Sequence, residues 1–163
     1  WPFLSEKEEF VQLSEMPESV ELPGAEEIAE KWHNFMELRD DVLKALEEAR
    51  NNKLIGKASE ANLELYVDDN VKAKLESLDT DVAQILMVSE LSINDASSAP
   101  SEAQNFNDGL SIVVKHAEGD VCERCRLIST DVGSDADYPQ FCARCAKIVR
   151  DNFPETATEG FEE

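Results

Sequence analysis

All four cysteines of this 163-residue chain lie near its C-terminal end, as two Cys-x-x-Cys pairs. Cys122 and Cys125 form the first pair, Cys142 and Cys145 form the second, and sixteen residues separate the pairs. A Cys-x-x-Cys turn can direct two sulfurs at one point, and two such turns about 15–20 residues apart are typical of a Zn²⁺ site. The spacing therefore predicts one zinc ion held by four thiolates. Two disulfides, or four unrelated buried thiols, are the alternatives.

The segment between the pairs suits a short reversal of the chain. Its turn-forming residues are Gly133, Ser134, Asp135 and Asp137, and Pro139 stiffens the return to the second pair. Four sulfurs fill every position of a tetrahedral ion, whereas catalytic zinc keeps one position open for water or substrate. We therefore expect a structural metal, and we expect His116 to be an ordinary residue ending a strand.

The charge of the chain is strongly negative and unevenly distributed. Asp and Glu number 36 against 15 Lys and Arg, for a formal net charge of −21. This balance argues against a free-standing nucleic-acid-binding protein, which usually carries a basic face, so we expect no DNA partner. Residues 1–114 hold 9 basic and 25 acidic residues, whereas residues 115–150 hold six of each. The cysteine module, residues 117–150, is thus the least acidic part of the chain.

A long amphipathic helix is the clearest element in the remaining sequence. Apolar residues recur at three- and four-residue steps through residues 25–56, and Gly56 is a reasonable terminator. Trp32, Phe35 and Met36 are expected to face the core, because an apolar stripe on a helix is ordinarily a packing face.

Strand-like and helical patterns follow the helix and predict an α+β fold with a small αβ domain. In order, they indicate strand 58–68, short helix 69–78, strand 82–95 with two apolar faces, loop 96–109 and strand 110–119. The predicted domains are a strap plus the long helix (1–56), the αβ domain (57–116), the cysteine module (117–150) and a disordered acidic tail (151–163). We expect no catalytic site in the chain, because it lacks a phosphate loop and an activated nucleophile.

The N-terminal end has the character of a segment from a longer protein. Residues 1–24 mix apolar and acidic side chains without a sustained period, and the chain starts at Trp1 rather than at methionine. We expect this segment to lie as an extended strap across another surface. No apolar run approaches the length of a bilayer span, so no membrane association is expected.

Several stretches resemble the C-terminal portion of the bacterial isoleucyl-tRNA synthetases. The resemblance covers nearly the whole chain and fails mainly in residues 95–109 and the tail. It is carried by "WPFL", by "ESVELP", by "EKWHNFMELRDDVLKALEEARNNKLIGKASEANLELY", by "ILMVSELSI" and by "CERCRLISTDVGSDADYPQFCARCAKIV".

The resemblance implies a part of a class I aminoacyl-tRNA synthetase. The three parts would be the end of the anticodon-binding helical domain, a junction domain and a terminal zinc-binding domain. The family's catalytic signatures are not in these residues, so ATP and isoleucine would be handled by the rest of the parent enzyme. The implied partners are tRNA(Ile) and that remainder, and the parent is expected to be monomeric and cytoplasmic.

Basic residues of the cysteine module are the candidates for contact with tRNA. They are Arg124, Arg126, Arg144 and Lys147. A chain this acidic cannot attract RNA by its overall field, so local contacts would have to suffice. Many family members carry an aromatic residue where this chain has Arg126, which would replace base stacking by a guanidinium stack or a phosphate contact. The alternative for each is a solvated surface charge.

Two other interpretations remain. The chain could be a free-standing zinc-ribbon adaptor that binds a protein through its acidic face; such an adaptor would show no salt-dependent tRNA affinity. A valyl or leucyl relative is disfavoured, because the Ile-Gly-Lys run at residues 55–57 and the terminal cysteine pairs occur together.

Overall fold

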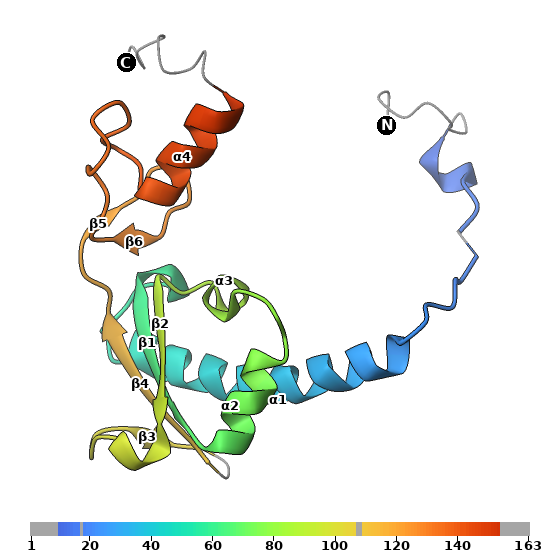
Figure 1. The fold of residues 1–163 in the computed structure, drawn as a ribbon, viewed down its shortest axis with the longest axis horizontal. Helices are drawn as coiled ribbons and strands as arrows, with labels where there is room; N and C mark the ends of the chain where they lie inside the picture. The colour runs from blue at the N-terminus through green and yellow to red at the C-terminus, as the bar shows by residue number, and fades with distance from the viewer. Residues whose placement is uncertain (1–9, 17, 107–108, 154–163) are drawn as a thin grey trace.

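A computed structural model describes residues 10–16, 18–106 and 109–153 of the chain (Figure 1). It has the predicted α+β fold: a long helix, a small mixed sheet, and a separate unit that carries the four cysteines. The helices are α1 (Ala25–Asn51), α2 (Asp69–Glu76), α3 (Val82–Leu86) and α4 (Ala143–Asn152), with 3-10 turns at Val11–Leu13, Ala58–Glu60 and Ala96–Ser98. The strands are β1 (Ala61–Val67), β2 (Glu90–Asp95), β3 (Gln104–Asn105), β4 (Leu110–His116), β5 (Asp120–Val121) and β6 (Ile128–Ser129).

Four of these strands form one sheet in the order β2-β1-β4-β3. Strand β1 is parallel to β2 and antiparallel to β4, and β3 is antiparallel to β4. The register places Leu63 opposite Val114 and Leu65 opposite Ile112, so these side chains share one face. Helices α1, α2 and α3 contribute buried residues to the core on that face. The alternation predicted for β1 is confirmed, and the sheet has a helical layer on this face.

The first turns of helix α1 are not buried. Its buried apolar residues start at Phe35, while Ile28, Trp32 and Met36 are 53%, 39% and 46% exposed. The prediction that Trp32 and Met36 face the core is therefore wrong. Helix α1 runs across the strands, and its first turns extend past the sheet to one side (Figure 1).

The C-terminal end of α1 lies before Gly56, which was wrongly predicted to terminate the helix. Lys53 has the left-handed conformation, with φ 61°. Its N–H donates to the carbonyl of Arg50 at 3.0 Å, and the N–H of Leu54 donates to that of Ala49 at 2.9 Å. These two bonds form the Schellman arrangement that ends many helices. A lysine thus takes the position that glycine usually occupies.

The segment predicted as one strand over residues 82–95 is a helix followed by a strand. Helix α3 starts after Asp81, whose carboxylate accepts a hydrogen bond from the Gln84 N–H at 3.3 Å. It ends at Met87, which has φ 59°, and β2 begins three residues later. The strand prediction was wrong for residues 82–86 because a short continuous apolar run has no period that separates helix from strand.

Near the N-terminus, the side chains that the structure describes in residues 10–24 are all exposed. Five of them are large and apolar: Phe10, Leu13, Met16, Val20 and Leu22. Residues 1–9 and 17 of the predicted strap, and residues 154–163 of the predicted disordered tail, lie outside the described residues. The domain boundaries remain predictions. Among the described helices, none is both long and apolar enough to cross a membrane.

Candidate metal centre

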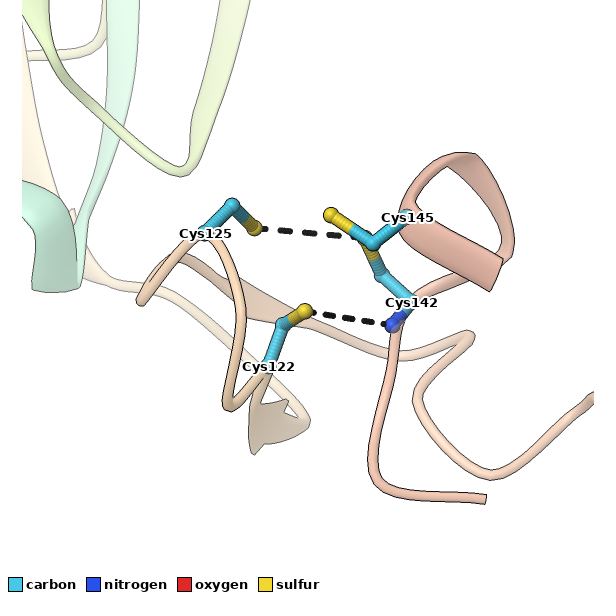
Figure 2. A group of neighbouring side chains, drawn as sticks. All are labelled: Cys122, Cys125, Cys142 and Cys145. Carbon is cyan, nitrogen blue, oxygen red and sulfur yellow. Dashed lines mark hydrogen bonds between the residues drawn. The ribbon is translucent and has the colours of Figure 1, made fainter. Parts of the chain in front are cut away.

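The four cysteines come from two turns that face each other (Figure 2). Strand β5 pairs with β6 in a short hairpin, and the turn between them carries Cys122 and Cys125. Cys142 is the N-cap of α4, and Cys145 lies in the first turn of that helix. Sequence analysis did not predict α4, although this helix positions two of the four sulfurs.

The geometry of the sulfurs fits a single tetrahedral ion. All four Sγ atoms lie within 4.8 Å of one another, and Cys125 Sγ lies 3.9 Å from Cys142 Sγ. Ligands at a Zn–S distance of about 2.3 Å are about 3.8 Å apart at the corners of a tetrahedron. A disulfide requires a separation of about 2.05 Å, and all four cysteines are free. His116 is not part of this four-sulfur set.

A very small core surrounds the sulfurs. Cys122, Cys142 and Cys145 are buried and Cys125 is half-buried, packed with Tyr138, Phe141 and Ala146. The two aromatic rings stack with their centroids 6.0 Å apart. So few apolar side chains supply little stability, and a metal ion would have to provide much of it.

Backbone N–H groups and burial have opposite effects on the thiols. Burial opposes ionisation of Cys122, but hydrogen bonds from the backbones of Cys125, Cys142 and Arg124 lower its pKa to about 6. The Cys142 N–H, for example, lies 3.3 Å from Cys122 Sγ. Burial raises the pKa of Cys142 to about 12. The backbone N–H groups thus favour a thiolate at Cys122, whereas burial opposes one at Cys142.

Asp131 links the hairpin to α4, a role that sequence analysis missed. Its Oδ2 accepts a hydrogen bond from the N–H of Ala143, the first residue of α4, at 3.3 Å. Its Oδ1 accepts from the Ser129 hydroxyl at 2.6 Å. A carboxylate at a helix N-terminus stabilises the helix. The partner is 12 residues away along the chain, so no local pattern indicates this contact.

The four predicted basic residues separate into two pairs. Arg124 Nη1 lies 3.6 Å from Cys145 Sγ, and a hydrogen bond to Cys125 raises the pKa of Arg144. Arg126 and Lys147 are exposed, and their side chains form no hydrogen bond or ion pair with any residue that the structure describes. Arg126 also has a left-handed backbone, with φ 64°.

The hairpin with one Cys-x-x-Cys pair, and the helix start with the second, define a four-cysteine zinc finger. Residues 119–148 match the family described as "Zinc finger found in FPG and IleRS". The chain is 57% identical over 162 residues to an isoleucine–tRNA ligase of Lactiplantibacillus plantarum, and 56% identical over 168 residues to that of Levilactobacillus brevis. These alignments cover 99% and 100% of the chain, but 17% and 18% of the relatives.

The match over the full chain confirms the predicted resemblance. This chain belongs to the isoleucine–tRNA ligase family and represents a C-terminal portion of it. It spans less than a fifth of the length of these relatives.

Proposed function

We propose that this chain is the tRNA-binding C-terminal portion of an isoleucine–tRNA ligase. In this proposal the cysteine module binds one structural Zn²⁺ and helps to hold the anticodon end of tRNA(Ile). The parent enzyme, acting in the cytoplasm as a monomer, attaches isoleucine with ATP at a catalytic site outside this chain. The names of the relatives and the nearly neutral charge of residues 115–150 support the proposal.

The zinc assignment follows from the chemistry of the ligand set. Four thiolates suit Zn²⁺ or an iron–sulfur centre among the common biological metals. Zinc requires no redox partner and accepts the tetrahedral arrangement of the four sulfurs without strain. With all four positions filled by protein, the ion would stabilise the module and leave no site for substrate.

Arg126 is the residue that carries the RNA-binding proposal. Its left-handed backbone, with φ 64°, belongs to the turn in which the Arg126 N–H donates to the Cys122 carbonyl, and it leaves the side chain exposed. The guanidinium has no ion-pair partner among the described residues, so it can stack on a base or bind a phosphate. Lys147, also exposed and without such a partner, would add a second phosphate contact. Arg124 and Arg144 would contribute only the N–H groups that do not face sulfur.

Exposed apolar side chains indicate where the rest of the parent would lie. Ile28, Trp32 and Met36 protrude from the first turns of α1, and Phe10 and Leu13 are exposed upstream. An apolar surface of this kind is usually covered by another protein surface. We propose that the preceding helical part of the synthetase covers it.

The test replaces Arg126 by glycine in the full-length synthetase. Glycine adopts φ 64° without strain, so this variant should be at least as stable as the wild type, and any loss of RNA binding cannot be attributed to misfolding. The KM for tRNA(Ile) should rise about 5- to 20-fold while the KM for isoleucine stays constant, as expected for a contact worth about 1–2 kcal/mol.

Lys72→Ala is the matched control, because it removes one exposed cation from α2, outside the cysteine module. It should leave both KM values unchanged. An equal rise in the two KM values for Arg126→Gly, or none, would contradict the RNA contact. Absence of any salt-dependent tRNA affinity in the parent would favour the adaptor interpretation instead.

A further inference from the structure

Two arginines of the cysteine module occupy equivalent places in its two cysteine pairs. Arg124 directly precedes Cys125, and Arg144 directly precedes Cys145. Arg124 Nη1 approaches Cys145 Sγ at 3.6 Å, within hydrogen-bond range for sulfur. Arg144 lines one cleft together with Cys125. Each guanidinium thus reaches across to the last cysteine of the opposite pair.

We propose that Arg124 and Arg144 are positioning residues of the metal site, each donating a hydrogen bond across it to one thiolate ligand. This inference rests on the metal proposed above. The positions of the two arginines in the sequence do not indicate this role. A surface arginine is usually interpreted as a solvated charge or as a phosphate contact. The crossed arrangement connects the β5–β6 hairpin to α4 through side chains as well as through the ion.

Charge balance gives the physical reason for the arrangement. Four thiolates and one Zn²⁺ leave an excess of two negative charges around mostly buried sulfurs. Burying uncompensated charge is costly, and the chain as a whole is already strongly acidic. Two guanidinium groups balance the excess locally. Charge-assisted hydrogen bonds of this kind are roughly twice as strong as neutral ones.

Each cysteine pair also shows how its arginine can reach the far sulfur. The second pair starts α4, so Arg144 lies in the first turn of a helix whose N-cap is Cys142. From there Arg144 lines a cleft of about 200 Å³ that also contains Cys125 and Cys142. Arg124 lies in the tight turn between Cys122 and Cys125, and the backbone of that turn is held by the Arg126 N–H donating to the Cys122 carbonyl at 2.8 Å. Both guanidinium groups are therefore carried by backbone that is already constrained.

The test uses the zinc-loaded chain with four single variants. Arg124→Gln and Arg144→Gln remove the proposed bonds. Arg126→Gln and Lys147→Gln remove the same charge from the same module without touching a sulfur, and serve as matched controls. Competition with a chromophoric chelator at pH 7 should show a loss of zinc affinity of about 10-fold for each of the first two variants. The controls should remain within about 2-fold of the wild type, because exposed charges interact weakly.

Thiol labelling provides a second readout that a general loss of stability cannot imitate. With zinc bound, iodoacetamide labelling mapped by peptide mass should accelerate at Cys145 in Arg124→Gln, and at Cys125 in Arg144→Gln. A thiolate that loses a hydrogen bond becomes a better nucleophile, so acceleration at the distant cysteine is the specific signature. Should Arg124→Gln fail to fold, Arg124→Lys keeps the charge but not the guanidinium, and its labelling at Cys145 should still be faster than in the wild type.

Three outcomes would overturn the inference. These are equal zinc loss in variants and controls, faster labelling at the cysteine next to the substituted arginine, or labelling unchanged at the distant one. Failure of the zinc assignment gives a different result, because the wild-type chain would then bind no zinc at all. Failure of the RNA-binding proposal would leave all of these zinc measurements unaffected.

Discussion

The backbone N–H of Ile128 donates a hydrogen bond to the Ser89 hydroxyl at 2.7 Å, across the junction between the sheet and the cysteine module. The same hydroxyl donates to the Ser59 carbonyl at 2.7 Å, and the Ser89 N–H donates to the Ala61 carbonyl at 3.0 Å. One small side chain thus connects three segments. These bonds join the cysteine module to the sheet.

Ser89→Ala should lower the free energy of unfolding of the metal-loaded chain by about 1–3 kcal/mol. The substitution leaves the N–H of the buried Ile128 and the Ser59 carbonyl without this partner, and unpaired buried polar groups cost about that much. Urea denaturation measures the change. Ser92→Ala is the control, because Ser92 is an exposed residue of β2, which begins directly after Ser89, and it should change stability by less than about 0.5 kcal/mol. Equal effects of the two substitutions would contradict the junction role.

Glu64 and Lys115 should make the sheet sensitive to acid. Lys115 Nζ donates to the Glu64 carboxylate at 2.6 Å across β1 and β4, and this bond lowers the pKa of Glu64 from its ordinary 4.5. Folding is therefore favoured by the ionised carboxylate. Its contribution is fully present above pH 4.5 and is lost as the pH falls through the lower pKa of the folded state. Lys115 is half exposed, so solvent weakens the ion pair and its contribution to stability is small.

Unfolding free energies between pH 7 and pH 3 measure this effect. Glu64→Gln should be less stable than the wild type at pH 7, and the difference should shrink toward pH 3. Glu118→Gln, at an exposed carboxylate, is the control and should parallel the wild type throughout. A constant gap between Glu64→Gln and the wild type at all pH values would rule out the ionic contribution.

Gly119 should tolerate no side chain, because the backbone of β6 at Ser129 passes directly beside it. Its φ is 109°, and a Cβ there would lie 2.3 Å from the Ser129 carbonyl oxygen. Gly119→Ala should therefore destabilise the cysteine module by about 2–4 kcal/mol, through backbone strain plus overpacking. Gly24 also has positive φ, at 78°, but open space around it, so Gly24→Ala should cost about 1 kcal/mol or less. Thermal unfolding of both variants separates the cost of a positive φ, which both share, from the cost of the steric clash, which only Gly119→Ala has.

Local patterns in the sequence predicted the elements that show a hydrophobic period or a fixed residue spacing. The alternation in β1, the stripe of α1 and the spacing of the cysteines each reflect a contact pattern that repeats along the chain. The sequence could not predict at which residue the apolar stripe of α1 stops being buried in the core. Trp32 and Phe35 look equivalent in the pattern, and only the tertiary packing of α1 shows that Phe35 is buried and Trp32 is not.

The missed features depend on contacts between distant segments. Helix α4 starts within the second cysteine pair, and the spacing of that pair was interpreted as a metal-binding turn rather than as the start of a helix. Helix α3 is too short to show a hydrophobic period. Asp131 and Ser89 act on partners 12 and 39 residues away, so nothing nearby in the sequence indicates their roles. Arg124 likewise reaches a sulfur 21 residues away, a distance that no motif of four residues can encode.

Removal of the metal should unfold the cysteine module and spare the rest of the chain. Cys142 faces the other sulfurs from the N-cap position of α4, where its side chain makes no capping hydrogen bond, so Cys142→Ser removes a metal ligand without removing a helix cap. Amide hydrogen exchange should show α4 and β6 losing their protection, while α1 and β1 retain theirs, because their core contains no module residue. Chelation of the wild-type metal should reproduce the pattern, and Ser134→Ala, in the exposed loop, should leave it unchanged. Full protection of α4 after chelation would exclude a structural metal.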